Sequence, residues 1–217
     1  MNGRHFAVLR PAAQSPIGLS VLLAFALFVS APSAATSSVT IGGPFALSTP
    51  DGRTVTDQTY RGKWLLVYFG YTFCPNSCPT TLLEVATALK ELGAAAGQIQ
   101  PLFITVDPQR DTPTVMQEYT QSFDPRIIGL TGTPQQIAAV AREYGAYYVA
   151  HRTGSGPNDY VMDHSTYVYV MNPEGKFVRA FASGDHIADT LRKLLTPGPH
   201  EGAAGGNATL AMHPSKE

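Results

Sequence analysis

The sequence predicts an α/β fold, in which a mixed central sheet is flanked by helices and preceded by an N-terminal hairpin. Three observations support this prediction. Continuous apolar runs at residues 64–69 and 102–106 are typical of strands covered on both faces. Helical stripes with capping signals follow these runs. Two β-rich runs joined by a turn stand near the end of the chain, at residues 166–171 and 177–181.

The first elements are a small hairpin, a central strand and a helix. Apolar residues on both sides of the turn dipeptide Asp51-Gly52 indicate the hairpin, over about residues 45–55. The run at residues 64–69 then predicts the central strand. Pro79 suits the first turn of a helix, where an N–H is not needed, and Gly93 is a suitable residue to end that helix.

Two further helices in the middle of the chain begin with similar signals. Asp111-Thr112-Pro113 follows the second buried strand, and we expect Asp111 to cap a helix that begins at the proline. Thr133-Pro134-Gln135-Gln136 has the pattern of a capping box and opens a helix toward Tyr144. A short strand at Ile127-Ile128 is expected between the two helices.

The last third of the chain changes to antiparallel connections. Asn172-Pro173-Glu174-Gly175 has the turn chemistry of a hairpin between residues 166–171 and 177–181. A final helix is expected at about residues 187–195. Parallel β-α-β units followed by an antiparallel hairpin and a helix fit a thioredoxin-like sandwich.

Both ends of the chain differ from the middle. Residues 1–35 contain two arginines and no acid, then an apolar run and a string of small residues, which is typical of an export signal. The apolar run has 15 residues between its flanking prolines, fewer than the roughly 20 that cross a bilayer. Cleavage of this segment is therefore the first interpretation, and a short membrane anchor is the second.

We expect an exported, periplasmic protein that is soluble or anchored to the inner membrane. Its folded domain is expected at residues 41–195, followed by a disordered tail at 196–217.

The composition excludes several classes of protein. With 15 basic and 16 acidic residues, the chain has no excess of positive charge for nucleic-acid binding. Two cysteines cannot form the disulfide network of a small secreted scaffold, so stability must come from a buried apolar core. The 217 residues admit one domain, which we expect to be a monomer.

Cys74 and Cys78 lie in the loop between the central strand and the next helix. This loop is at the carboxyl end of the strand, the edge at which α/β sheets bind ligands. Cys78 falls at the start of the helix, where the helix dipole favours a thiolate, so we expect its pKa to be lowered. Three residues separate the cysteines, one more than in a C-x-x-C redox motif. A stabilising disulfide is the structural alternative, although so short a loop constrains the unfolded chain little.

His164 is the third candidate for this site. It precedes a strand expected at residues 165–170, and if that strand is antiparallel to the central one, its amino end meets the cysteine loop. Two thiolates and one imidazole suit Cu(I) or Zn(II). Asp163 and nearby backbone are available to orient the imidazole through its other nitrogen. The alternative is a histidine with a purely structural role at a strand end.

Four segments together resemble the Sco (SenC/PrrC) family of copper proteins. They are YFGYTFCPNSCP at residues 68–79, TVDPQRDTP at 105–113, LTGT at 130–133 and MDHS at 162–165. The resemblance extends over about residues 41–195. It implies a thioredoxin-like fold and one copper ion bound by Cys74, Cys78 and His164. It also implies a role in assembling the dinuclear copper centre, CuA, of cytochrome c oxidase.

The resemblance leaves two functions open. In the first, the protein is a metallochaperone that carries copper to the oxidase. In the second, Cys74 and Cys78 are a redox pair that reduces the cysteines of the oxidase copper site, so enzyme activity is left open. The implied partners are the copper-bearing oxidase subunit, a periplasmic copper donor and a thioredoxin-like reductant. Peroxide reduction, a third activity known for this fold, is disfavoured because Thr72 alone does not make the polarising site it needs.

Three details near the motifs complete the prediction. Asn76 stands where the family usually has aspartate, and the lost carboxylate is expected to weaken copper binding or raise the disulfide potential. The aromatic residues around the cysteine loop are expected to form core and site wall; they are Tyr68, Phe69, Tyr71 and Phe73. Asp107 and Asp111 belong to a matching segment, but the sequence indicates no mechanism for them beyond a turn and a helix cap.

Overall fold

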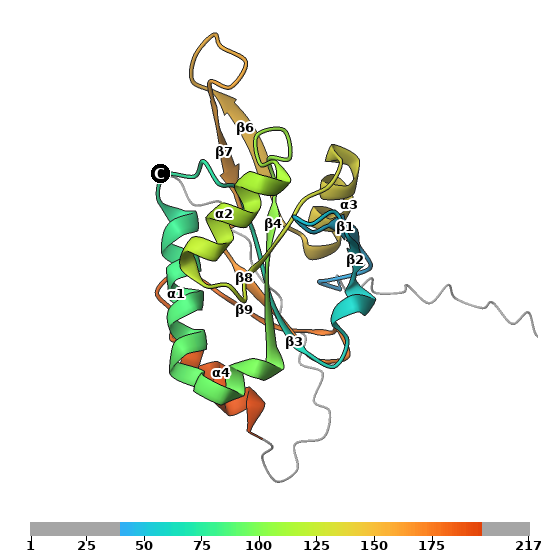
Figure 1. The fold of residues 1–217 in the computed structure, drawn as a ribbon, viewed down its shortest axis with the longest axis vertical. Coiled ribbons are helices and arrows are strands. Elements are labelled where there is room, and N and C mark those ends of the chain that lie inside the picture. Colours follow the sequence, from blue (N-terminus) through green and yellow to red (C-terminus); the bar gives the residue numbers. More distant parts are fainter. Residues whose placement is uncertain (1–39, 197–217) are drawn as a thin grey trace, which may run out of the picture. The chain divides into compact units, whose positions relative to one another are not determined.

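A computed structural model of the chain describes residues 40–196. Its centre is a five-stranded sheet with the order β5-β4-β3-β8-β9 (Figure 1). The strands are β3 (Trp64–Gly70), β4 (Ile99–Thr105), β5 (Ile128–Leu130), β8 (Val168–Met171) and β9 (Phe177–Phe181). β3, β4 and β5 are parallel, whereas β8 is antiparallel to β3 and to β9. The predicted mixed sheet is therefore confirmed.

The register of the sheet determines which ends of the strands meet. Tyr68, near the carboxyl end of β3, pairs with Val168, the first residue of β8. The chain that enters β8 consequently comes from the same sheet edge at which β3 leaves. This edge carries the cysteine loop, as the sequence analysis expected.

Four helices cover the two faces of the sheet. They are α1 (Ser77–Leu92), α2 (Pro113–Phe123), α3 (Pro134–Tyr144) and α4 (Ile187–Leu195). The ring of Tyr119 in α2 packs against Phe103 on the face that also holds α1, and α4 lies beside α1. α3 packs on the opposite face, where Tyr144 contacts Phe69 (Figure 1). This arrangement is the predicted thioredoxin-like sandwich.

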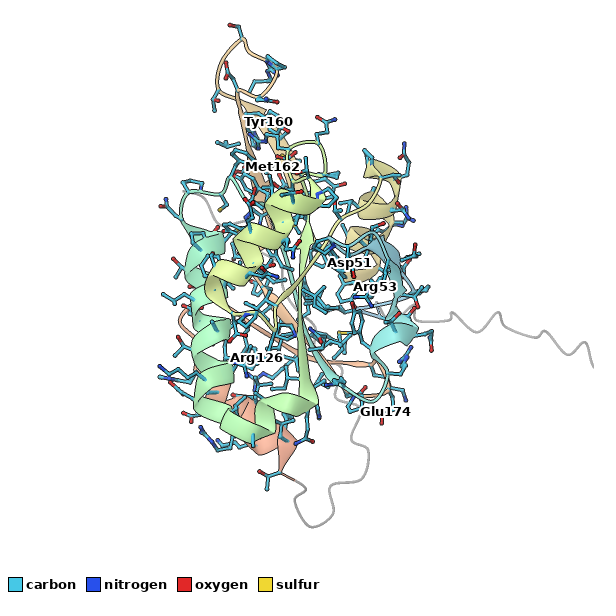
Figure 2. The ribbon with its side chains drawn as sticks, in the orientation of Figure 1. Asp51, Arg53, Arg126, Tyr160, Met162 and Glu174 are labelled. Atoms are coloured by element: carbon cyan, nitrogen blue, oxygen red, sulfur yellow. The ribbon has the colours of Figure 1, made fainter. Side chains whose placement is uncertain are left out.

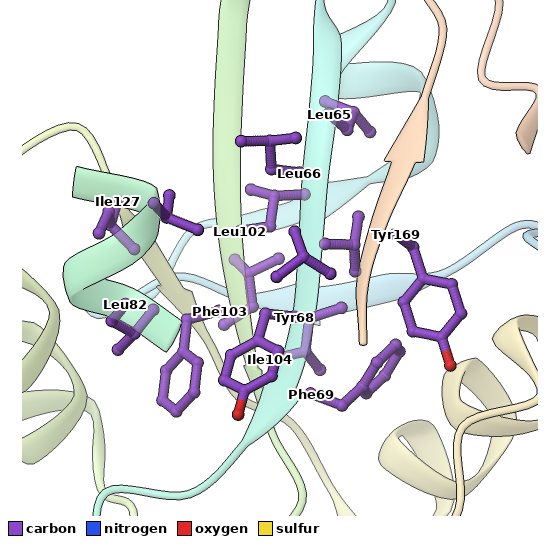
Figure 3. Close-up of a cluster of buried hydrophobic side chains, with 14 of the residues drawn as sticks. Leu65, Leu66, Tyr68, Phe69, Leu82, Leu102, Phe103, Ile104, Ile127 and Tyr169 are labelled. Atoms are coloured by element: carbon purple, nitrogen blue, oxygen red, sulfur yellow. The ribbon is translucent and has the colours of Figure 1, made fainter. Parts of the chain in front are cut away.

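The core is built by the alternation of side chains along the buried strands. Tyr68 and Phe69 are neighbours in β3, and their side chains point to opposite faces of the sheet. Tyr68 packs beside Phe103, and Phe69 packs against Tyr169 and α3 (Figure 3). Both side chains are almost fully buried. Burial on both faces explains why β3 has a continuous apolar sequence and no alternation.

The helix ends follow the sequence signals, with one correction. α1 ends at Gly93, which has a positive φ of 55°, and α3 begins with the complete capping box of Thr133 and Gln136. α2, in contrast, is capped by Thr112, whose side chain accepts a hydrogen bond from the backbone of Val115. The prediction that Asp111 caps this helix is wrong, because its carboxylate is turned inward to the site described below.

Two small hairpins flank the main sheet. The predicted N-terminal hairpin is present as β1 (Ala46–Ser48) and β2 (Thr54–Thr56). A second hairpin, β6 (Tyr148–Arg152) with β7 (Tyr160–His164), was not predicted. It extends beyond the carboxyl edge of the main sheet (Figure 1), and most of its residues are exposed or only half-buried. Apolar and polar residues do not alternate along either strand, so the sequence lacks the usual signal of a half-buried strand.

Short 3-10 segments complete the described chain, at Asp57–Tyr60 and Gly93–Gln98. Among the described residues, no helix is long and apolar enough to span a bilayer. The predicted export signal or anchor at residues 1–35 lies outside the described residues, as does nearly all of the predicted disordered tail. Those assignments, and the expected domain boundaries, stay predictions.

Candidate metal centre

Three potential ligand atoms converge at the carboxyl end of β3. The sulfurs of Cys74 and Cys78 and a ring nitrogen of His164 all lie within 4.8 Å of one another. Cys74 comes from the loop after β3, Cys78 from the first turn of α1, and His164 from the end of β7. Within residues 40–196 they are the one cluster of three or more His, Cys, Asp or Glu side chains that could hold a metal ion.

The start of α1 determines where the two sulfurs lie. The helix begins at Ser77, immediately after Asn76, and its first turn has N–H groups with no helical partner. One of them, the backbone N–H of Cys78, donates to the Cys74 sulfur at 3.4 Å. The Ser77 hydroxyl lies 3.2 Å from the same sulfur. Both cysteines are free thiols, and the helix start thus draws Cys74 toward Cys78.

His164 reaches this loop by a route that differs from the expected one. It is the last residue of β7 rather than the residue directly before β8, which begins at Val168. Its Nδ1 contacts the backbone oxygen of Ser165 at 2.9 Å, and its Nε2 lies 3.4 Å from the Cys78 sulfur. With the Nδ1 proton donated to that oxygen, the lone pair of Nε2 is free to face the thiols.

Two groups were expected to orient the imidazole of His164: nearby backbone and the Asp163 carboxylate. The first expectation is confirmed and the second is wrong. Nearby backbone, at Ser165, orients the imidazole. Asp163 does not, because alternation along β7 turns its side chain to the outer face of the hairpin, where it pairs with His151 at 2.8 Å.

Tyrosine rings form the inner wall of the site. Tyr71 and Tyr68 meet the imidazole of His164 edge to face, with ring centroids 5.7 Å and 6.2 Å away. The Tyr68 hydroxyl also donates to the Cys78 sulfur at 3.7 Å. Phe73 differs from the expectation of core or wall, because 55% of it is exposed beside Cys74.

The two thiols have opposite electrostatic environments. The hydrogen bond from the Cys78 thiol lowers the pKa of Cys74 far below its usual value, and the contacts with His164 and Ser77 lower it further. Burial raises the pKa of the Cys78 thiol, and its interaction with Cys74 adds to this rise. The predicted lowering of the Cys78 pKa is therefore wrong. Desolvation of a fully buried sulfur outweighs the helix dipole, and the half-buried partner holds the negative charge instead.

The donor set fits a soft metal ion. The Cys74 sulfur, whose pKa is lowered, a second sulfur and an oriented imidazole provide three ligands without an added carboxylate. The site is closed on the Cys78 side and open on the Cys74 side, since Cys78 is fully buried and Cys74 only half-buried. Such an arrangement can hold an ion and still admit a ligand from another molecule.

The residues that support the cysteine loop were not predicted from the sequence. The buried carboxylate of Asp111 accepts hydrogen bonds from the backbone and hydroxyl of Thr72 and from the hydroxyl of Thr105. A single buried acid has no periodic pattern, so the only available signal was its position in a segment that matches the family.

Comparison with known proteins identifies related chains. A model of the SCO1/SenC family matches residues 33–196. Protein SenC of Rhodobacter capsulatus is 41% identical over 178 residues, which cover 79% of this chain and 80% of that protein. The mitochondrial SCO1 homolog 1 of Arabidopsis thaliana is 44% identical over 152 residues, which cover 70% of this chain. The chain spans about half the length of this relative and of a mitochondrial SCO2 homolog of Bos taurus, 45% and 59% respectively.

A solved structure agrees with these matches. The structure of Bradyrhizobium japonicum ScoI with copper bound is 42% identical, with a TM-score of 0.65, and the match covers 71% of this chain and 97% of that one. The family model matches well over half of the residues of this chain, and the chain therefore belongs to the SCO1/SenC family.

Proposed function

We propose that the protein binds one copper ion through Cys74, Cys78 and His164 and supports assembly of the CuA centre of cytochrome c oxidase. The observation that carries this proposal is the convergence of two sulfurs and one imidazole nitrogen within 4.8 Å. A buried sulfur, a half-buried thiolate and an imidazole fixed through its Nδ1 give a soft, partly preorganised ligand set.

The choice of copper over zinc is supported by the relatives. The 42% identical ScoI of Bradyrhizobium japonicum has been solved with copper bound, as has yeast Sco1 at 36% identity. Three protein ligands also leave a copper ion accessible to a further ligand, which transfer to another protein requires. In this proposal Cys78 and His164 anchor the ion, and Cys74, on the open side, is the ligand first exchanged.

The partners follow from this function. We propose the copper-bearing subunit of the oxidase as recipient, a periplasmic protein as copper donor, and a thioredoxin-like protein as reductant. The last is needed because a Cys74–Cys78 disulfide cannot bind copper, so loading requires two free thiols. The export signal expected at residues 1–35 would bring the domain to that compartment, where it would act as a monomer, soluble or anchored.

Copper titration of the reduced full-length chain tests the proposal. We expect one copper per chain, with affinity strongly weakened by His164→Ala and by either Cys→Ser change. His151→Ala is a matched control, because His151 lies on the neighbouring strand with its ring paired to Asp163. Equal copper affinity in wild type and His164→Ala would refute the proposed ligand set.

A second function, thiol–disulfide reduction, is favoured by the difference between the two thiols. Cys74 is accessible and has the lowered pKa, so it is suited to attack a partner disulfide. One partner sulfur would leave as a thiolate, and buried Cys78 would then attack the mixed disulfide and release the second. The partner gains two electrons and Cys74–Cys78 becomes a disulfide. This activity should survive His164→Ala, whereas copper binding should not.

A further inference from the structure

The segment from Asp107 to Asp111 has no part in the proposed ligand set. It follows β4 and forms a turn, in which the backbone N–H of Asp111 donates to the carbonyl oxygen of Asp107 at 3.0 Å. Asp107 and Asp111 are nevertheless buried, with 3% and 0% exposure. Buried charged groups are costly unless they are well paired, so the partners of these two carboxylates indicate what the segment holds in place.

One end of the segment holds the start of the cysteine loop. Asp111 accepts hydrogen bonds from the N–H and the hydroxyl of Thr72, at 3.1 Å and 2.6 Å. It also accepts one from the hydroxyl of Thr105 at the end of β4, at 2.5 Å. The loop is thereby tied to the neighbouring strand two residues before Cys74.

Arg110 reaches the same loop through its aromatic residues. Its guanidinium carbon lies 4.9 Å from the ring centroid of Phe73 and 5.7 Å from that of Tyr71. Phe73 directly precedes Cys74 in the chain. A guanidinium near an aromatic face is attracted by the negative charge of the ring face, which restricts the position of the ring.

The other side of Arg110 holds the hairpin that carries His164. Its guanidinium carbon lies 3.7 Å from the ring centroid of Tyr160, and its Nη1 donates to the carbonyl oxygens of Tyr160 and Asn158 at 2.9 Å and 3.2 Å. The Tyr160 hydroxyl donates to Asp107 at 2.7 Å, and Arg110 Nε donates to the same carboxylate. Figure 2 shows Tyr160 on β7, with Met162 nearer the main sheet.

Besides the contacts of Arg110 and Asp107, the hairpin is joined to the core by a hydrogen bond from the Met162 N–H to the Tyr71 hydroxyl, at 3.3 Å, and by the partly buried side chains of Tyr148 and Met162. β6 and β7 pair only with each other in the described part of the chain. A cavity of about 340 Å³ separates the hairpin from the turn after β4 and from α3, with Tyr148, Met162, Val106 and Ile137 among its lining. Loosely packed segments open at low free-energy cost, so the contacts made by Arg110 and Asp107 contribute to holding His164 in place.

We propose that Arg110 is a positioning residue that joins the cysteine loop to the histidine hairpin and so fixes the distance between the thiols and His164. The proposal rests on the copper function proposed above. The side chain is only 9% exposed and makes both sets of contacts with one rigid planar group. A lysine has neither the planar fork nor the ability to stack in this way, so Arg110→Lys should not restore the site.

Copper affinity in a double-mutant cycle of the full-length chain tests this role. Arg110→Met keeps an apolar side chain of similar length, and we expect it to weaken copper binding about 10- to 100-fold, as is usual for groups that orient a ligand. In the His164→Ala background the same change should have less than about a twofold effect, because no imidazole is left to position. Arg126→Met is the control, since Arg126 pairs with Asp124 far from the hairpin (Figure 2).

A measurement without copper gives an independent test. Amide hydrogen exchange at Val161 and Asp163, which lie opposite His151 and Val149 in the hairpin, should be faster in Arg110→Met than in Arg126→Met, while exchange in β3 stays unchanged. If Arg110→Met does not fold, Tyr160→Phe replaces it. That change removes only the hydroxyl bonded to Asp107, and should give smaller effects in the same direction in both experiments.

The outcomes separate this proposal from the copper function itself. Wild-type affinity in Arg110→Met, or an equal loss with and without His164, would overturn the positioning role and leave the proposed ligand set intact. An unchanged affinity in His164→Ala would instead refute the ligand set, and the positioning role with it.

Discussion

Gly70, the last residue of β3, lies against the buried sulfur of the candidate metal centre, and replacing it with alanine tests the packing there. A Cβ atom at this position would lie 2.6 Å from the Cys78 sulfur and 2.7 Å from Cε2 of Phe103. Non-bonded atoms of this size prefer separations of about 3.5–4.0 Å. Because Cys78 and Phe103 are both fully buried, neither can move into solvent to make room.

The expected cost is that of overpacking a close-packed core. Inserting one methyl group at such a site destabilises by about 1–3 kcal/mol. With a urea dependence of about 2 kcal/mol per molar, a loss of 2 kcal/mol lowers the unfolding midpoint by about 1 M. A sulfur displaced by the clash would leave its present position 3.4 Å from Nε2 of His164, so the same variant should bind copper more weakly.

Urea unfolding of the reduced, copper-free protein is the assay, with Gly97→Ala as the matched control. Gly97 lies in an exposed 3-10 segment, and a Cβ built there meets no atom within 4 Å. Alanine should be neutral there, or stabilising by up to about 1 kcal/mol through the unfolded chain. If both variants had equal midpoints and wild-type copper affinity, β3 would not approach Cys78 as described, and the reasoning would be wrong.

Three further predictions concern the same domain. Asn76→Asp adds a carboxylate at the N-cap of α1, where the present side chain makes no capping bond. This change should stabilise the domain by up to about 1 kcal/mol and tighten copper binding. Weaker copper binding in a titration would contradict this prediction. The lowered pKa of Cys74 keeps its thiolate as the pH falls, so its alkylation by iodoacetamide in the metal-free protein should be nearly as fast at pH 6 as at pH 8. An ordinary thiol would slow about 75-fold over that range, and mass spectrometry should find Cys78 unmodified. Thr133→Ala removes the cap of α3 and should cost about 1 kcal/mol in urea unfolding without changing copper affinity.

Most elements of the main sheet could be predicted from local sequence. The apolar run at residues 64–69 needs no partner to be recognised, because burial on both faces requires apolar side chains at every position. The cap of α3 was equally readable, since Thr133 and Gln136 bond to each other's backbone within one turn. The β6–β7 hairpin was not readable, because an exposed two-stranded hairpin needs no apolar pattern.

The ligand candidates were predictable, but their chemistry was not. Cys74, Cys78 and His164 were identified from motif and strand order, and the antiparallel pairing of β8 with β3 was predicted, although His164 ends the unpredicted strand β7 and does not directly precede β8. The pKa of Cys78 was predicted in the wrong direction, because the helix position is local information whereas burial of the sulfur depends on strands β3 and β4 packing over it. The inward orientation of the Asp111 carboxylate could not be predicted for the same reason, because its partners Thr72 and Thr105 come from two other segments of the chain.

The sequence by itself determined the strands and helices of the main sandwich, the capping box of α3 and the three candidate ligands, because each depends on side chains close together in the chain or on a recognisable motif. Only the tertiary structure decided which thiol holds the charge, which backbone oxygen orients His164, and how Arg110 connects loop and hairpin. The contact of His164 with its neighbour Ser165 depends on the backbone conformation at the end of β7. The charge on the thiols and the role of Arg110 depend on desolvation and on contacts between segments far apart in the chain, such as that of Arg110 with Tyr160, 50 residues away. Such contacts exist only once the sheet has brought those segments to one edge.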